Sequence, residues 1–174
     1  MYVSLDIETG GLNHGMDILQ IAMVKNDRYD IMECSHLDII IKKFVYKVEP
    51  FAAAMHPQLW NILKEGTDPR IVDGYKAAWA KIGAFLGVAK NFALGKNVGL
   101  FDLPFMANHG FQWERFFRHR LCDVGTLYST PEGIPSLKEL MEKYPEVTIP
   151  GDGYHDALWD ARLTLLLARK AWES

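Results

Sequence analysis

Tyr2-Val3-Ser4-Leu5-Asp6-Ile7-Glu8-Thr9-Gly10-Gly11 is the stretch of the sequence that says most about the fold. Successive side chains of a β-strand point to opposite faces, so Val3, Leu5 and Ile7 share an apolar face. Asp6 and Glu8 then point together to the other face. Two carboxylates this close repel each other unless a cation lies between them. The stretch therefore predicts a first strand that carries a site for a hard divalent metal.

The length and composition are those of one ordinary globular domain. The 174 residues, 49% hydrophobic and 24% charged, predict a single domain spanning 1–174. Cys34 and Cys122 are far apart and form no Cys-x-x-Cys motif, so neither a zinc site nor a disulfide framework is expected. We find no signal-like segment and no apolar run of membrane length. We therefore expect a soluble, cytoplasmic protein that does not enter a membrane.

Hydrophobic periodicity predicts that strands come first and that helices then alternate with strands. Strand-like patterns occur at 17–24, 36–42, 44–48, 92–95 and 120–123. Helical patterns occur at 51–63, 75–86 and 104–110, after the capping box of Ser136 and Glu139, and in a last helix with Leu158, Ala161, Leu165, Ala168 and Trp172 on one face. This order predicts an α/β fold with a mixed central sheet flanked by helices.

Two further acids are candidate site residues. Asp156 is a good N-cap for the last helix, which brings His155, just before the cap, close to Asp160 in the first turn. Asp102 is the one acid in a long apolar stretch, and acids are rarely buried unless they are paired or bind metal. A simpler alternative makes Asp102 and Asp156 helix caps and leaves His155 and Asp160 on the solvated surface.

Taken together, these segments resemble the DEDDh 3′–5′ exonucleases, the proofreading-type branch of the ribonuclease-H-like superfold. The first motif of that family corresponds to residues 6–12, the second to 97–102, and the third, His-x-Ala-x-x-Asp-Ala, to 155–161. A lone Asp-x-Glu is a weak signal, but the three motifs together cover nearly the whole chain. The second motif departs from the commonest pattern, because Asn97 and Asp102 are five residues apart and Lys96 replaces a histidine.

The resemblance implies a ribonuclease-H-like mixed central sheet and catalysis with two Mg²⁺ or Mn²⁺ ions about 4 Å apart. By the same resemblance Asp6 bridges both ions, Glu8 and Asp160 complete the ion that holds the attacking water, and Asp102 supports the second ion. His155 takes the proton from that water, a task that suits an ordinary histidine pKa of about 6.5. The implied products are nucleoside 5′-monophosphates released from a 3′ end.

Substrate contacts are expected around the first two motifs, at Thr9, Gly10, Gly11, Leu12, Asn97 and Phe101. Gly10 and Gly11 would let the backbone approach the terminal nucleotide closely. Leu12 resembles the apolar residue that packs on the last base, although an ordinary hydrophobic turn explains it equally well. A structural role suits Asn97 and Phe101 better than a substrate contact. The remaining histidines, His56 among them, are scattered along the sequence and are assigned no chemistry.

The expected partner is a nucleic-acid 3′ end, as single-stranded DNA or RNA, with DNA slightly preferred. RNA trimming or oligoribonucleotide decay is the alternative within the same enzyme class. A catalytically silent nucleic-acid-binding or polymerase-binding module is an alternative of a different class, although all four acids and the histidine are present. The net charge of −3 argues against a protein that coats nucleic acid non-specifically. A homodimer or an association with a polymerase stays open.

Overall fold

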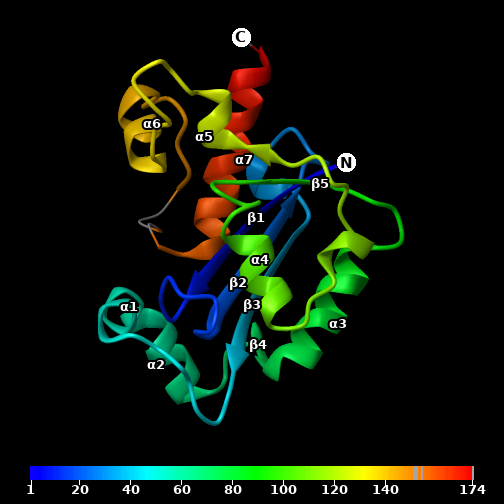
Figure 1. Cartoon of the computed structure of the whole chain (residues 1–174), viewed down its shortest axis with the longest axis vertical. Helices are drawn as coiled ribbons and strands as arrows, with labels where there is room; N and C mark the ends of the chain where they lie inside the picture. The colour runs from blue at the N-terminus through cyan, green and yellow to red at the C-terminus, as the bar shows by residue number, and fades with distance from the viewer. Residues whose placement is uncertain (151–152, 154, 174) are drawn as a thin grey trace.

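The computed structural model describes residues 1–150, 153 and 155–173, and its centre is a mixed sheet with helices on both faces (Figure 1). Across these residues the strand order is β4-β3-β2-β1-β5-β6. The strands are β1 (Tyr2–Thr9), β2 (Ile18–Lys25), β3 (His36–Lys42), β4 (Ile71–Asp73), β5 (Phe92–Gly95) and β6 (Cys122–Asp123). The β1–β2 and β2–β3 pairs are antiparallel, whereas β1–β5, β3–β4 and β5–β6 are parallel. The predicted α/β fold is confirmed.

Apart from a short helix at 124–127, which was not predicted, the described helices follow the predicted positions with one division. They are α1 (Pro50–Met55), α2 (Pro57–Glu65), α3 (Gly74–Leu86), α4 (Asp102–Asn108), α5 (Val124–Leu127), α6 (Leu137–Lys143) and α7 (Ala157–Glu173), with short 3₁₀ turns η1 (Ile31–Glu33) and η2 (Trp113–Arg115). The single helix predicted at 51–63 is two helices, because Pro57 has no N–H to continue α1 and keeps His56 out of the helical conformation. The capping box at the start of α6 is confirmed.

The two faces of β1 meet different layers of the protein, as the alternation predicts. Val3, Leu5 and Ile7 are buried in the core cluster that includes residues of α3 and α4. On the opposite face, α7 packs its buried Ala157, Ala161, Leu165 and Ala168 against Ala22, Val24 and Leu94 of the sheet. Figure 1 shows α7 lying across the sheet on this side. The even-numbered residues of β1, including Asp6 and Glu8, therefore face the side of the sheet that α7 covers.

The strand predicted at 44–48 is wrong: this segment has no regular structure and runs past the end of β1. Its backbone is held by the turn that follows β1, since Lys47 N donates to Asp17 Oδ2 at 2.7 Å and Glu49 N donates to Gly10 O at 2.7 Å. The apolar alternation has a different cause, because Tyr46 and Val48 pack on the cluster formed by Leu19, Ile40 and Leu59.

The described residues include no helix with both the length and the apolar character needed to span a bilayer.

Candidate active site

Three separate elements bring the predicted acids together. Asp6 and Glu8 lie on β1, next to the middle of the sheet. Asp102 is the first residue of α4, and Asp160 lies in the first turn of α7. Glu8, Asp102 and Asp160 are all buried, with exposed fractions of 8%, 2% and 7%. The acids meet because the first residues of α4 and α7 both lie beside the second half of β1, where the backbone of Ile7 bonds Asp102 and the charge of Asp160 acts on Glu8.

Glu8, His155 and Asp160 form a cluster with the geometry of a metal site. One ligand atom from each, a carboxylate oxygen or a ring nitrogen, lies within 4.8 Å of the others, among the residues that the structure describes. Asp160 Oδ1 is buried and has no hydrogen-bond partner in the described part of the chain. A buried carboxylate oxygen without a partner is costly for the fold unless a cation binds it. The cluster therefore fits a bound cation.

The start of α7 gives His155 its position. Asp156 is the predicted N-cap, and its Oδ1 accepts hydrogen bonds from the backbone N–H groups of Leu158 and Trp159, both at 3.1 Å. His155 just before it has a φ of 68°, the left-handed conformation that non-glycine residues adopt rarely. This turn of the chain brings the imidazole ring of His155 toward Asp160 and Glu8.

Asp102 does not cap its helix, so that sequence-based alternative is wrong. The N-cap of α4 is Phe101, and Asp102 is the first helical residue with its side chain buried. Burial raises the pKa of Asp102 to about 7, against the opposing effect of hydrogen bonds from the backbone at Asp102 and Ile7. A buried acid with a raised pKa next to other acids is an unfavourable arrangement in the absence of a cation.

The other three acids show the same effect. Burial, and then the charges of Asp102, Glu8 and Asp160, raise the pKa of Asp6 well above its ordinary value. Burial and the nearby Asp160 raise the pKa of Glu8 to about 8, and burial raises the pKa of Asp160 to about 7. At neutral pH the four carboxylates cannot all ionise cheaply without added positive charge. Carboxylate oxygens in this number are the ligands that Mg²⁺ and Mn²⁺ prefer, so these residues fit such ions.

His56 is a site residue that the sequence did not reveal. It lies between α1 and α2, is 3% exposed, and its Nε2 is 3.4 Å from Glu8 Oε2. Its ring centroid lies 6.4 Å from that of His155. Burial, and then His155, lower the pKa of His56, so the ring that touches Glu8 is mostly neutral at pH 7. The one signal in the sequence is Pro57, which forces His56 out of the helix and leaves its side chain free to face β1.

A pocket of about 300 Å³ opens beside Glu8. Its walls include the predicted substrate residues Thr9, Gly11, Leu12 and Phe101, together with His56 and apolar residues of α1. Leu12 and Phe51 are large apolar side chains of this pocket, with exposed fractions of 82% and 77%. The pocket therefore offers apolar surface directly next to the acids.

Gly10 and Gly11 have a role within the protein itself. A Cβ at Gly10 would lie 2.6 Å from Lys47 O, and a Cβ at Gly11, where φ is +155°, would lie 2.6 Å from the Glu49 carboxyl carbon. The segment 47–49 thus occupies the space that the missing side chains of these glycines leave open. Gly11 lines the pocket as well.

Asn97 lies apart from this pocket. It is exposed, has a φ of 61°, and its backbone N–H donates to the carboxylate of Asp123 in β6. It borders a different hollow, with Leu100 and Leu121 among its neighbours, and is absent from the described walls of the pocket beside Glu8.

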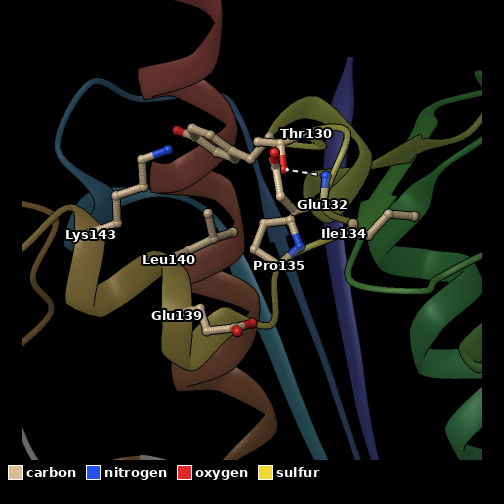
Figure 2. A pocket seen from close by; sticks show the side chains of 9 residues that line it. Thr130, Glu132, Ile134, Pro135, Glu139, Leu140 and Lys143 are labelled. Carbon is tan, nitrogen blue, oxygen red and sulfur yellow. Dashed lines mark hydrogen bonds between the residues drawn. The ribbon is translucent and has the colours of Figure 1, made fainter.

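A further hollow of about 240 Å³ lies between the end of α5 and α6 (Figure 2). Figure 2 shows Thr130, Glu132, Pro135, Leu140 and Lys143 around it, with Glu132 N donating to Thr130 Oγ1 at 3.3 Å. The predicted site residues are all absent from the described walls of this hollow. We assign it no part in the chemistry.

Solved structures with a similar fold include exonucleases. Escherichia coli exonuclease I in complex with a dT13 oligonucleotide is 18% identical, with a TM-score of 0.66 over 98% of this chain and 40% of that chain. The zinc-bound form of the E. coli exonuclease I–single-stranded DNA complex is 20% identical, with a TM-score of 0.65 over 97% of this chain and 39% of that chain. The present chain thus spans about two fifths of the length of these enzymes.

A similar fold occurs in a yeast RNA exonuclease. The Saccharomyces cerevisiae Pan2 pseudoubiquitin hydrolase–RNA exonuclease module, in complex with AAGGA RNA, is 14% identical, with a TM-score of 0.63 over 99% of this chain and 29% of that chain. Identities this low establish a shared fold. Among curated proteins, no sequence matches this chain.

The sequence profile of the RNase_T family, described as "Exonuclease", matches residues 3–168 and so spans all the acids and His155. Together with the ribonuclease-H-like arrangement of the sheet, this match establishes that the chain belongs to the RNase_T exonuclease family, the DEDDh-type hydrolases expected from its three motifs.

Proposed function

We propose that this chain is a metal-dependent 3′–5′ exonuclease that hydrolyses the terminal phosphodiester bond of a nucleic acid and releases nucleoside 5′-monophosphates. The observation that carries the proposal is the convergence of Glu8, His155 and Asp160 within 4.8 Å, beside Asp6 and Asp102, in a chain of an exonuclease family. We further propose that residues 1–174 act as one exonuclease domain.

The resemblance to the DEDDh exonucleases divides the acids between two ions. Asp6, Glu8 and Asp160 would hold one Mg²⁺ or Mn²⁺ ion, and Asp102 with Asp6 would hold a second, since Asp6 interacts electrostatically with every other acid of the set. When bound, such ions neutralise the charge of the phosphodiester and lower the pKa of the attacking water. The zinc-bound form of E. coli exonuclease I supports a divalent cation in this fold.

His155 is the proposed general base. Its ring lies within reach of the Glu8–Asp160 pair, so it can accept a proton from a water held there. The left-handed backbone at His155 and the cap made by Asp156 fix the ring at this place. A histidine that accepts a proton must be neutral.

The pocket beside Glu8 is the proposed place for the terminal nucleotide. Leu12 and Phe51 are exposed there and Phe101 forms part of the wall, so they can pack on the faces of bases. Packing of this kind does not depend on base identity, which suits an enzyme that removes nucleotides one after another. Thr9 and Gly11 would face the sugar.

Single-stranded DNA is the preferred substrate in this proposal, and RNA is the alternative. The two E. coli complexes contain DNA and the yeast module contains RNA, so the shared fold accommodates both in other proteins. Selection between them depends on contacts to the 2′-OH of the sugar.

The test is digestion of oligonucleotides labelled at the 5′ end, in which removal from the 3′ end gives a ladder of shortening labelled products. Matched single-stranded DNA, single-stranded RNA and duplexes are compared with Mg²⁺, with Mn²⁺ and with EDTA. A metal-dependent ladder, with mononucleotides as the released product, supports the proposal. Release of the labelled terminal nucleotide in one step would indicate the opposite polarity, and no cleavage in any metal would favour a silent binding module.

A further inference from the structure

Gln20 is a fully buried polar side chain in which both the amide nitrogen and the amide oxygen form hydrogen bonds. It lies on β2 with an exposed fraction of 0%. Its Nε2 donates to Asp38 Oδ1 at 2.9 Å and to Asp156 Oδ2 at 3.1 Å, and its Oε1 accepts from the backbone N–H of Ala157 at 3.3 Å. A buried amide contributes favourably only when it is bonded in this way. Gln20 thus makes two direct bonds from the sheet to the start of α7.

The place of Gln20 makes these bonds relevant to the candidate active site. Gln20 is the cross-strand partner of Glu8, so the two side chains leave the same face of the sheet. The residue that it holds, Asp156, caps α7 directly after His155, and Asp160 N donates to Asp156 O at 3.0 Å. A shift of the cap would move the functional groups of both His155 and Asp160.

The sheet end of this connection is itself anchored. Arg70 Nη1 donates to Asp38 Oδ2 at 2.9 Å, and Arg70 also binds Asp68 through its Nε and Nη2 atoms. Asp38 therefore presents its Oδ1 to Gln20 from a fixed position. A chain of bonds runs from Arg70 through Asp38 and Gln20 to Asp156, across the face that α7 covers.

The charges explain why an amide is needed. Asp38 and Asp156 are both carboxylates, and the group between them has to donate to each. The neutral NH₂ of glutamine does so and leaves its oxygen for Ala157 N. A glutamate would place a third carboxylate at the same point, and a leucine would remove the hydrogen bonds of Asp38 Oδ1, Asp156 Oδ2 and the Ala157 N–H.

We propose that Gln20 is a positioning residue, which fixes the start of α7 against β1 so that His155 and Asp160 face Glu8. Only the effect of Gln20 on catalysis rests on the proposed function. The effect on the start of α7 and on cation binding follows from the bonds alone, and both can be measured in protein that is not turning over.

Three variants test the connection against general loss of stability. Gln20→Leu removes all the side-chain hydrogen bonds of residue 20. Gln20→Glu keeps the shape of the side chain but replaces the donating NH₂ group with an accepting oxygen. Leu165→Ala removes a buried apolar contact of α7 with the sheet, away from the start of the helix, and is the matched control. Hydrogen exchange of the backbone N–H groups of 157–160 is measured without metal, and Mn²⁺ affinity is measured by calorimetry.

We expect both Gln20 variants to speed exchange at 157–160 by about tenfold or more and to weaken Mn²⁺ binding by about 10- to 100-fold, the range for supporting residues of metal sites. Leu165→Ala lowers the melting temperature without either effect. The proposal is overturned if Gln20→Glu behaves like the wild type, or if Leu165→Ala changes exchange and affinity as much as Gln20→Leu.

A double variant gives a sharper test that does not depend on Gln20→Leu folding. In Gln20→Glu with Asp156→Asn, the asparagine can donate to the new carboxylate and still cap the helix. We expect the double variant to recover part of the exchange protection and Mn²⁺ affinity that Gln20→Glu loses, because the bond to residue 156 can form again whereas the bond to Asp38 cannot. No recovery would count against a direct bond. A wild-type protein without nuclease activity would contradict the proposed function, whereas the exchange result would still decide the role of Gln20.

Discussion

Glu8 on β1 and Gln20 on β2 lie directly opposite each other in the antiparallel register, with Glu8 beside His56 and Gln20 bonded to the cap of α7. This one pair of neighbouring strand positions therefore carries Glu8, an acid of the candidate metal site, and Gln20. Gln20 in turn binds the start of α7, the helix that carries Asp160. The geometry of the site depends on the sheet register, because a slip of one strand by one residue would turn its side chain of this pair to the other face.

Asp160→Asn should abolish activity and leave the fold intact. The amide cannot supply the charge that a divalent cation needs, so we expect kcat to fall by several orders of magnitude. The melting temperature of the metal-free protein should stay the same or rise, because burial raises the pKa of Asp160 and makes its charged form unfavourable. Single-turnover digestion and thermal unfolding in EDTA measure the two effects, and near-normal activity would remove Asp160 from the metal site.

The stability of the metal-free protein should fall as the pH rises from about 5 to about 8. Glu8 has a pKa of about 8 in place of 4.5, and Asp102 and Asp160 have pKa values of about 7 in place of 3.8. The folded protein therefore binds more protons than the unfolded chain in this window, and the free energy of unfolding decreases with pH. Urea titrations in EDTA at several pH values measure it.

The same titrations contain their own controls. Asp160→Asn should give a shallower dependence on pH, because one of the raised pKa values is gone. Millimolar Mg²⁺ should stabilise the protein most at the upper end of the window, since the ionised acids bind the cation and the bound state is favoured. A metal-free stability that does not change between pH 5 and 8 would show that the acids do not meet as described.

His155→Ala separates a base from a metal ligand. If His155 accepts the proton from water, kcat falls by about 10²–10⁴-fold while Mn²⁺ affinity stays close to the wild-type value. If the ring binds metal, as its distance to Glu8 and Asp160 permits, the affinity falls too. We expect the first result, measured by calorimetry and single-turnover kinetics on the same protein samples.

His56→Ala should weaken metal binding through Glu8. Without the ring 3.4 Å from its Oε2, Glu8 loses a contact that holds the carboxylate, and we expect Mg²⁺ affinity to fall by about 10- to 100-fold. The amide of His56→Gln can donate a hydrogen bond to Glu8 and should recover part of the loss. The exposed His36 gives the control, because His36→Ala should leave affinity unchanged. Equal affinities for all three variants would leave His56 a core residue only.

Leu12→Ala tests the pocket as a nucleotide site. Leu12 is 82% exposed, so its loss should not change stability, but it removes a surface on which a base can pack. We expect KM to rise several-fold or more, with a smaller change in kcat. The upper limit is the free energy of about 1–3 kcal/mol that stacking of one base on an aromatic ring contributes. Val88→Ala, exposed after α3, is the control. An unchanged KM would place the terminal nucleotide elsewhere.

Local patterns were enough to predict most of the fold. The alternation in β1 separated Val3, Leu5 and Ile7 from Asp6 and Glu8 correctly, because the strand period depends on the backbone alone. The caps made by Ser136 and Asp156 were also predictable, since a cap involves residues only two or three positions apart. The segment 44–48 was not, because its path depends on Asp17, about 30 positions earlier, which binds Lys47 N.

The sequence by itself determined that acids would gather at β1, because each of the three motifs is a short local pattern that includes an acid. Only the tertiary structure decided what supports them. His56 reaches Glu8 because α1 ends next to β1, and Gln20 reaches Asp156 across 136 positions of chain because α7 lies over the sheet. Contacts between residues so far apart leave no periodic or local signal, as they arise only when the layers pack.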